Sequence, residues 1–238
     1  MADLLGETVY KVNTKHKEVQ SHGFRWEKDI IVNVYGALID ELSNIKYTSK
    51  VDLPCNLNRL DRCDLSVKTS CNKNGVCMAD CLRIFDSVNR NSETPFHMVV
   101  IHYTQDDTTN RKNISSIIEI DLTNSRELLF GTITFDQISE LDKAIKLIPP
   151  KRKPTSEEYK NIYFMRDSLQ RLSGAIHLDI KCNSTQSRLQ CSFNRFQQFI
   201  ENNPTRIVAK SNTNEFRGGF ISSYIDSPRR NFNRKPNE

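Results

Sequence analysis

The sequence predicts an α/β protein with a mixed central sheet flanked by helices. Segments with apolar residues at helical spacing alternate along the chain with short apolar or alternating segments that are typical of strands. Their order does not repeat a regular strand–helix–strand unit, so a mixed sheet is favoured over a fully parallel one. The 238 residues suffice for one sizeable domain. We assign 1–238 to a single α/β domain, with a loose polar arm over 1–22.

The first half of the chain contains two predicted helices, 24–42 and 77–88, and three predicted strands, 44–52, 62–70 and 96–103. Both helices carry one apolar stripe. Glu27 lies near the predicted start of the first helix, where an acid suits the helix dipole, and we interpret it in that way. The strand 96–103 is apolar enough to be central in the sheet.

The second half contains predicted strands at 114–122, 127–135 and 175–182, and predicted helices at 136–148, 155–172 and 192–202. Pro149 and Pro150 end one helix, and Thr155 with Glu158 forms a capping box at the start of the next. These signals place helix boundaries more firmly than the apolar pattern alone does.

Composition limits the class of protein. Apolar residues make up 37% of the chain, and no apolar run is long enough to span a bilayer. The sequence also begins without a basic and apolar leader. We therefore expect a soluble, cytoplasmic protein that has no membrane partner.

The seven cysteines are an odd number, and they do not form a C-x2-C pair. Reduced and mostly buried thiols are the favoured interpretation. A zinc site at Cys71, Cys77 and Cys81 is the alternative, although their spacing is unusual for zinc.

Positive charge concentrates toward the C-terminus. The net charge is +5, and 188–238 holds nine Lys or Arg against four acids. Cations contact phosphates, while Asn, Gln and Arg can pair with base edges. We expect 183–238 to contact DNA and to end in a flexible basic tail. The predicted DNA-binding residues are Asn183, Ser184, Thr185, Gln186, Arg188, Arg217, Arg229 and Arg230.

The segment 63–70 carries the strongest chemical signal. Side chains alternate along a strand, so Asp64, Ser66 and Lys68 share one face, opposite Leu65 and Val67. A carboxylate can hold a divalent metal, and an ammonium can position or activate a water molecule. The segment is therefore typical of a metal-dependent phosphodiesterase.

The ordered set of Asp52, Ser66-Val67-Lys68 and Asp80 resembles the PD-(D/E)XK nuclease superfamily, in particular type II restriction endonucleases. Thirteen residues separate Asp52 from Ser66, and the match covers 24–104. The chain departs from the family pattern in two places. Pro54 follows Asp52 instead of preceding it, and Ser66 stands where the second acid is usual.

This resemblance implies a restriction-endonuclease-like core and a Mg²⁺-dependent, site-specific endonuclease for double-stranded DNA, acting as a homodimer. The implied catalytic residues are Asp52, Asp64, Ser66, Lys68 and Asp80, with Mg²⁺ bound by Asp52, Asp64 and Asp80. In some members of the family the following helix supplies the missing acid, which corresponds here to Asp80. The leading acid is either Asp52 or Asp64.

Two alternatives remain at the level of sequence. Asp179-Ile180-Lys181 is a second acid-x-Lys strand and an alternative active site. The other alternative is a non-catalytic nucleic-acid-binding protein that uses its basic C-terminal region.

Overall fold

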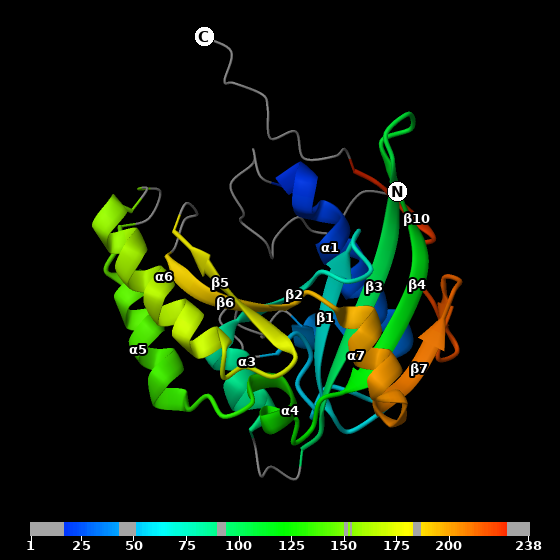
Figure 1. The fold of residues 1–238 in the computed structure, drawn as a ribbon. Helices are drawn as coiled ribbons and strands as arrows, with labels where there is room; N and C mark the ends of the chain where they lie inside the picture. The colour runs from blue at the N-terminus through cyan, green and yellow to red at the C-terminus, as the bar shows by residue number, and fades with distance from the viewer. Residues whose placement is uncertain are drawn as a thin grey trace.

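The computed structural model describes residues 17–42, 51–89, 94–149, 152, 154–182 and 187–227. It is a mixed α/β structure in which a curled mixed sheet is flanked by helices (Figure 1). The predicted fold class is therefore confirmed at this level.

The main sheet contains β1 (Asp64–Ser70), β3 (Phe96–Asp106), β4 (Arg111–Asp121), β7 (Ile207–Ser211) and β10 (Tyr224–Asp226). β1 lies at one edge and runs parallel to β3, whereas β3 and β4 are antiparallel. β4 also pairs with β7 and β10 along different parts of its length. The predicted strand 96–103 is thus a central strand, as expected.

A second sheet contains β2 (Val76–Asp80), β6 (Arg188–Phe193) and β5 (Ile176–Lys181), in that order and with both pairs antiparallel. The short strands β8 (Glu215–Phe216) and β9 (Gly219–Phe220) form a small hairpin. Its turn residues Arg217 and Gly218 have positive φ values of 50° and 83°, as a two-residue hairpin turn requires.

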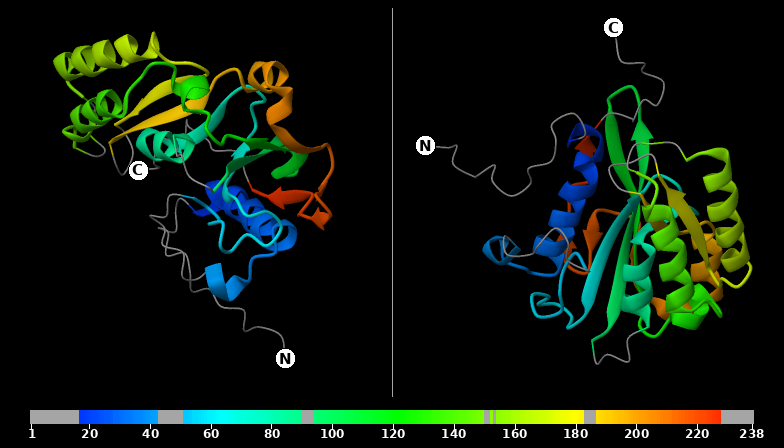
Figure 2. Two further views of the ribbon diagram at one scale, coloured as in Figure 1. Left: turned by 90° about the horizontal axis from the view of Figure 1, so that it is seen from below. Right: turned by 90° about the vertical axis from the view of Figure 1, so that its left-hand side faces the viewer.

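The helices are α1 (Lys17–Asp29), the π-helix η1 (Ile30–Val34), α2 (Ile39–Leu42), α3 (Cys81–Val88), α4 (Arg126–Phe130), α5 (Phe135–Lys146), α6 (Ser156–Gln170), α7 (Phe196–Asn202) and the 3-10 turn η2 (Pro204–Arg206). The right-hand view of Figure 2 shows α1 on one side of the main sheet and α3 and α6 on the other. The capping box of Thr155 and Glu158 begins α6 as predicted, and a second one, of Thr134 and Gln137, begins α5.

The two faces of the main sheet border two different apolar clusters. Leu65 and Val67 face the cluster that contains Trp26 of α1. Met98 and Val100 face the larger cluster, which also contains the inner faces of β5 and β6 and of α3, α5 and α7. Leu65 and Val67 are therefore buried on one side of β1, while on its polar side Asp64 and Ser66 are also buried and Lys68 is partly exposed.

Four sequence-based assignments need correction. The predicted helix 77–88 begins only at Cys81, because Val76–Asp80 pairs with β6 as a strand. The predicted strand 127–135 contains α4, which ends at Gly131 with φ +59°. In the predicted helix 192–202, the first two residues belong to β6 and the helix begins at Phe196. In each case sheet pairing or a terminating glycine overrides the local apolar pattern.

The fourth correction concerns the N-terminal region. Helix α1 already begins at Lys17. Residues 17–22 therefore belong to this helix and not to the predicted arm 1–22, and the helix begins earlier than the predicted start at 24. Most of the predicted strand 44–52 lies outside the described residues. Next to it, Leu53 forms an isolated antiparallel bridge with Leu65.

Candidate functional site

Asp52 lies alongside the edge of β1. Its backbone N–H donates to the Leu65 carbonyl at 2.9 Å, next to the bridge between Leu53 and Leu65. The segment around Asp52 therefore follows β1 in the antiparallel direction. This pairing brings the Asp52 side chain to the middle of β1, although 13 residues separate it from Ser66.

One carboxylate oxygen of Asp52 collects three donors from β1. Oδ2 accepts from the Ser66 hydroxyl at 2.9 Å, from the Val67 backbone N–H at 2.7 Å and from the Lys68 ammonium at 3.0 Å. The side chains of Lys68 and Asp52 are only 17% and 27% exposed. An ion pair with this degree of burial and a backbone donor is well positioned.

Glu27 approaches this pair from α1. Burial and the negative charge of Asp52 raise the pKa of Glu27 to about 8, against an opposing effect of Lys68. Three ionisable side chains from α1, the 51–53 segment and β1 thus share one region. Our interpretation of Glu27 as a helix-dipole residue is wrong, because it lies near the C-terminal end of α1.

The other two predicted acids make different contacts. Asp64 is buried and accepts from the Cys55 backbone N–H at 2.9 Å. Asp80 is the N-cap of α3 and accepts from the Arg83 backbone N–H at 3.1 Å. Of the two candidates for the leading acid, the geometry therefore favours Asp52 over Asp64 as the partner of Lys68.

The second sheet has one polar face. Its inner residues pack in the larger apolar cluster, and the alternate positions form the polar sheet face: Cys77, His177, Asp179, Lys181, Arg188, Gln190 and Ser192. On this face Ser192 donates to Asp179 at 2.7 Å, and the His177 ring lies 3.9 Å from the same carboxylate.

Cys77 connects the polar sheet face with Lys68. Partial desolvation raises the pKa of the Cys77 thiol, and Cys191 and Asp179 raise it further, whereas the charges of Lys181 and Lys68 lower it. The charges of Lys68 in β1 and Lys181 in β5 therefore both lower the pKa of the same thiol.

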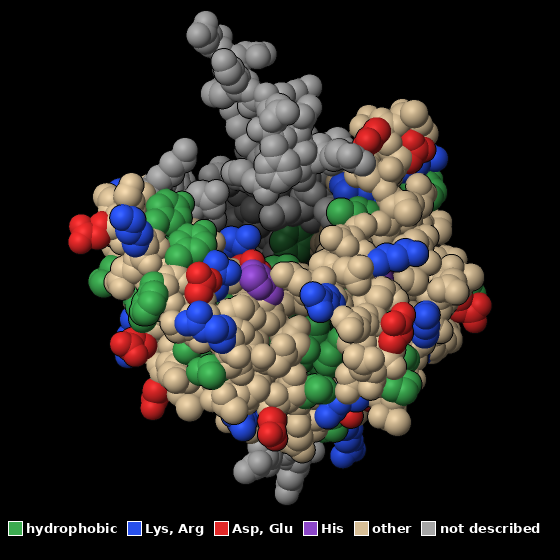
Figure 3. All heavy atoms as spheres, viewed as in Figure 1, with side chains coloured by type: hydrophobic (Ala, Val, Ile, Leu, Met, Phe, Trp, Pro, Cys, Tyr) green, Lys and Arg blue, Asp and Glu red, His purple; other side chains and the backbone are tan. Residues whose placement is uncertain are grey.

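Figure 3 shows Lys, Arg, Asp, Glu and His side chains together on the face between α5 and α6 on one side and β3 and β4 on the other. The predicted DNA-binding residue Arg188 lies in β6, opposite Lys181. Asn183, Ser184, Thr185, Gln186, Arg229 and Arg230 lie outside the described residues.

A second polar cluster lies at the opposite end of β1 from Lys68. Asp61 and Cys63 come from the loop before β1, His97 from β3 and Glu119 from β4, and their potential ligand atoms all lie within 4.8 Å of one another. Cys63 and Glu119 are buried. This buried set of Asp, Cys, His and Glu could hold a metal ion.

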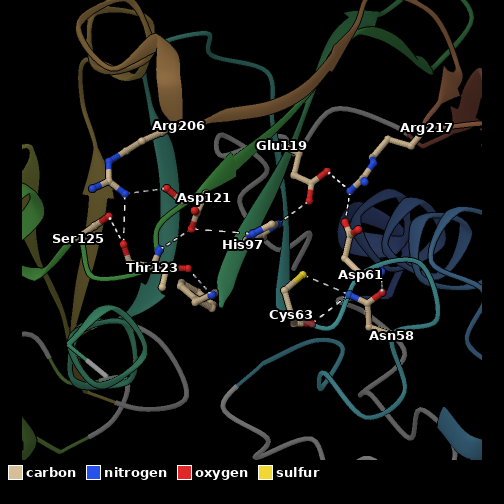
Figure 4. Close-up of polar contacts among 11 residues, drawn as sticks. Asn58, Asp61, Cys63, His97, Glu119, Asp121, Thr123, Ser125, Arg206 and Arg217 are labelled. Carbon is tan, nitrogen blue, oxygen red and sulfur yellow. Dashed lines mark hydrogen bonds and ion pairs between the residues drawn. The ribbon is translucent and has the colours of Figure 1, made fainter. Parts of the chain in front are cut away.

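Arg217 is bound to this cluster. Its guanidinium contacts Asp61 and donates to Glu119 at 2.8 Å, while His97 Nδ1 lies 2.7 Å from the other Glu119 oxygen (Figure 4). The structure thus uses Arg217 differently from the predicted DNA contact. Arg217 and Gly218 form the turn of the β8–β9 hairpin, and the Arg217 side chain points into the protein.

The cysteines do not form the alternative zinc site suggested by spacing. All seven are free thiols, and Cys81 is buried whereas Cys71 and Cys77 are exposed. Cys81 instead forms a hydrogen bond with Cys191, which contributes to raising the pKa of the Cys191 thiol.

Compared with known proteins, the chain matches no family model, no curated protein and no solved structure. Within the described residues, no helix has the length and apolar character needed to cross a bilayer.

The sequence did not predict the approach of Glu27 to Asp52 or the assembly of the cluster around Glu119. The role of Glu27 depends on where α1 begins. Because α1 begins at Lys17, Glu27 lies near the C-terminal end of the helix and not in its first turn. The cluster around Glu119 combines residues from three segments that are distant in sequence. The only signal of this cluster in the sequence is an Asp, a Cys and a His next to predicted strands. The register of the strands is needed to show that these residues meet.

Proposed function

We propose that this chain is a Mg²⁺-dependent endonuclease that cuts double-stranded DNA at specific sequences, in the manner of type II restriction enzymes. The observation that carries the proposal is the 3.0 Å pair of Lys68 and Asp52 at the edge of β1, with Glu27 beside it. A phosphodiesterase needs carboxylates from separate segments and a nearby cation, and this set provides both.

The donor set fits a hard divalent cation. Glu27 and Asp52 offer only carboxylate oxygens, which are the ligands that Mg²⁺ prefers. Their mutual repulsion is one cause of the raised pKa of Glu27, and a cation held by both carboxylates would reverse it. Bound Mg²⁺ would neutralise phosphate charge and acidify a water molecule. In this proposal Glu27 takes the ligand role that the sequence assigned to Asp64 and Asp80.

Lys68 would stabilise the charge that develops on the phosphate and position the attacking water. Its ammonium is fixed by Asp52 and by the Val67 carbonyl at 3.1 Å. An ammonium fixed in this way is oriented before the substrate binds, which is the main requirement for electrostatic catalysis.

The polar sheet face would bind the DNA beside the site. Lys181 and Arg188 lie opposite each other there and would contact phosphates. A homodimer would match a palindromic site and two cuts.

A plasmid of known sequence tests the proposal. Incubation with Mg²⁺ should give discrete fragments whose sequenced ends share one motif, and EDTA should prevent their formation. A gel shift without cleavage would instead support a non-catalytic nucleic-acid-binding protein. Cleavage by the Lys68→Ala variant at the wild-type rate would refute the assignment of the site.

A further inference from the structure

The cluster of Asp61, Cys63, His97 and Glu119 is separate from the site around Lys68. It lies at the start of β1, and Lys68 lies near the end of that strand. Cys63 is 1% exposed and Glu119 is fully buried. A buried carboxylate is costly unless a cation or several donors compensate it. The site therefore requires positive charge.

Asn58 holds two of the four side chains in place. Its carboxamide oxygen accepts from the backbone N–H groups of Leu60 and Asp61 at 3.2 and 2.9 Å. Its amide donates to the Cys63 carbonyl at 3.0 Å and to the Cys63 sulfur at 3.3 Å. Since Asn58 is only 5% exposed, this loop is built around a buried residue that orients Asp61 and Cys63.

His97 is oriented in a similar way. Its Nδ1 faces Glu119 at 2.7 Å, and its Nε2 lies 3.9 Å from an oxygen of Asp121. The short contact with Glu119 orients the ring, whereas the separation from Asp121 is an ion-pair distance and exceeds that of a hydrogen bond. Figure 4 shows His97 between these two carboxylates, with Asp61 and Cys63 on the side of Glu119.

We propose that this cluster is a Zn²⁺ site, and that Zn²⁺ and the guanidinium of Arg217 are alternative occupants. Zn²⁺ would bind the Cys63 sulfur, the His97 imidazole and the carboxylates of Asp61 and Glu119. Arg217 would leave the carboxylates and extend into solvent. Thiolate and imidazole ligands favour Zn²⁺ over Mg²⁺, which prefers oxygen and retains its water.

The exchange conserves the charge of the buried site. With Arg217 bound, two carboxylates and one guanidinium leave one net negative charge. When Zn²⁺ binds, the Cys63 thiol loses its proton to solvent. Two carboxylates, one thiolate and the doubly charged ion then again give one net negative charge.

The hairpin allows the Arg217 side chain to move alone. Gly219 packs against η1 so closely that a Cβ would lie 2.4 Å from the Asn33 carbonyl, which fixes the backbone. Arg217 lies at the turn, its side chain is 20% exposed, and rotation about its own bonds can release the guanidinium. The β8–β9 hairpin can therefore stay in place in both states.

Cobalt, which substitutes for zinc and reports sulfur ligation by a charge-transfer absorption, provides the test. The full chain is stripped with a chelator and titrated with Co²⁺, then with Zn²⁺. We expect a thiolate-to-cobalt band that saturates at one sulfur-bound Co²⁺ per chain, and loss of the band when Zn²⁺ displaces the cobalt. Cys63→Ser should abolish the band, whereas the matched change at an exposed thiol, Cys71→Ser, should leave it intact.

Arg217→Ala separates this proposal from a purely structural ion pair. Removal of the competing guanidinium should raise the affinity for Zn²⁺ by on the order of tenfold or more. It should also lower Tm without metal, because two carboxylates lose their cation, and Zn²⁺ should restore Tm. The proposal is wrong if the band is absent, if it persists in Cys63→Ser, or if Zn²⁺ leaves the Tm of Arg217→Ala unchanged. If Cys63→Ser does not fold, His97→Gln replaces it and should weaken Co²⁺ binding, so that a higher Co²⁺ concentration is needed to saturate the band.

Discussion

The carboxylate of Asp52 and the ammonium of Lys68 lie 3.0 Å apart across the edge of β1. The same carboxylate oxygen also accepts the backbone N–H of Val67 at 2.7 Å. The ion pair is therefore tied to the strand itself and does not depend on two flexible side chains finding each other. In the proposed nuclease, that attachment would hold the pair in a fixed position for chemistry on a phosphate.

Lys68→Ala should lower the rate of Mg²⁺-dependent DNA cleavage by on the order of 10²-fold or more, because the positioned ammonium is lost. Asp52→Asn should have a similar effect. DNA affinity, measured by gel shift in Ca²⁺ or EDTA, should change little in Lys68→Ala. Lys210→Ala, in the exposed part of β7, is the matched control and should cut normally. An equal loss in the control would show that general charge, and not the site, is responsible.

Glu27→Gln should stabilise the metal-free protein increasingly between pH 5 and pH 8. Folded Glu27 keeps its proton up to about pH 8, whereas the ordinary pKa is 4.5. Between these values the folded state binds more protons, so the stability of the wild type falls as the pH rises. Each pKa unit is worth about 1.4 kcal/mol, so the glutamine variant, which cannot ionise, avoids a loss of up to several kcal/mol.

Unfolding by urea in EDTA at several pH values measures this difference. Added Mg²⁺ should then stabilise the wild type more than Glu27→Gln at pH 8, since only the wild type gains a second carboxylate for the ion. Parallel pH profiles for the two proteins would show that Glu27 ionises in the ordinary range.

Lys181→Ala should weaken DNA binding and reduce the slope of log affinity against log salt by about 1, as the loss of one phosphate contact does. The cleavage rate of bound DNA should be retained. Lys160→Ala, on α6, is the matched control, because α6 packs on the opposite face of the second sheet. Loss of cleavage at saturating DNA in Lys181→Ala, with normal cutting by Lys68→Ala, would move the active site to the strand that contains Asp179.

His102→Leu should make the protein less sensitive to acid. His102 is 1% exposed and packs against Phe196, and burial lowers its pKa from the ordinary 6.5. Below pH 6.5 the unfolded state therefore binds more protons, and stability falls by at most about 1.4 kcal/mol per pH unit. Thermal unfolding from pH 7 to pH 5 should show a shallower fall for the leucine variant. Equal falls would assign acid sensitivity to other groups.

Much of the local structure could be predicted from sequence because the signals are local. The capping box of Thr155 begins α6, and the alternation of Leu65 and Val67 with polar neighbours gives β1 its two faces. β2 could not be predicted, because the helical spacing of Met78 continues into α3 and only pairing with β6 makes 76–80 a strand.

In the candidate site too, some relationships follow from the sequence and others depend on the tertiary structure. Ser66 and Lys68 share a face through the period of the strand, and this follows from sequence. The choice of Asp52 over Asp64 depends on a bridge between Leu53 and Leu65 that sequence does not specify. The position of Glu27 depends on how α1 packs against the sheet.

By itself, the sequence determined the class of fold, the central strand β3 and the polar face of β1, because these follow from local periodicity and composition. Only the tertiary structure decided which acid meets Lys68 and that Arg217 turns inward to Asp61 and Glu119. These relationships join segments up to 156 residues apart. Packing and strand register fix such contacts, and neither leaves a periodic signal in the chain.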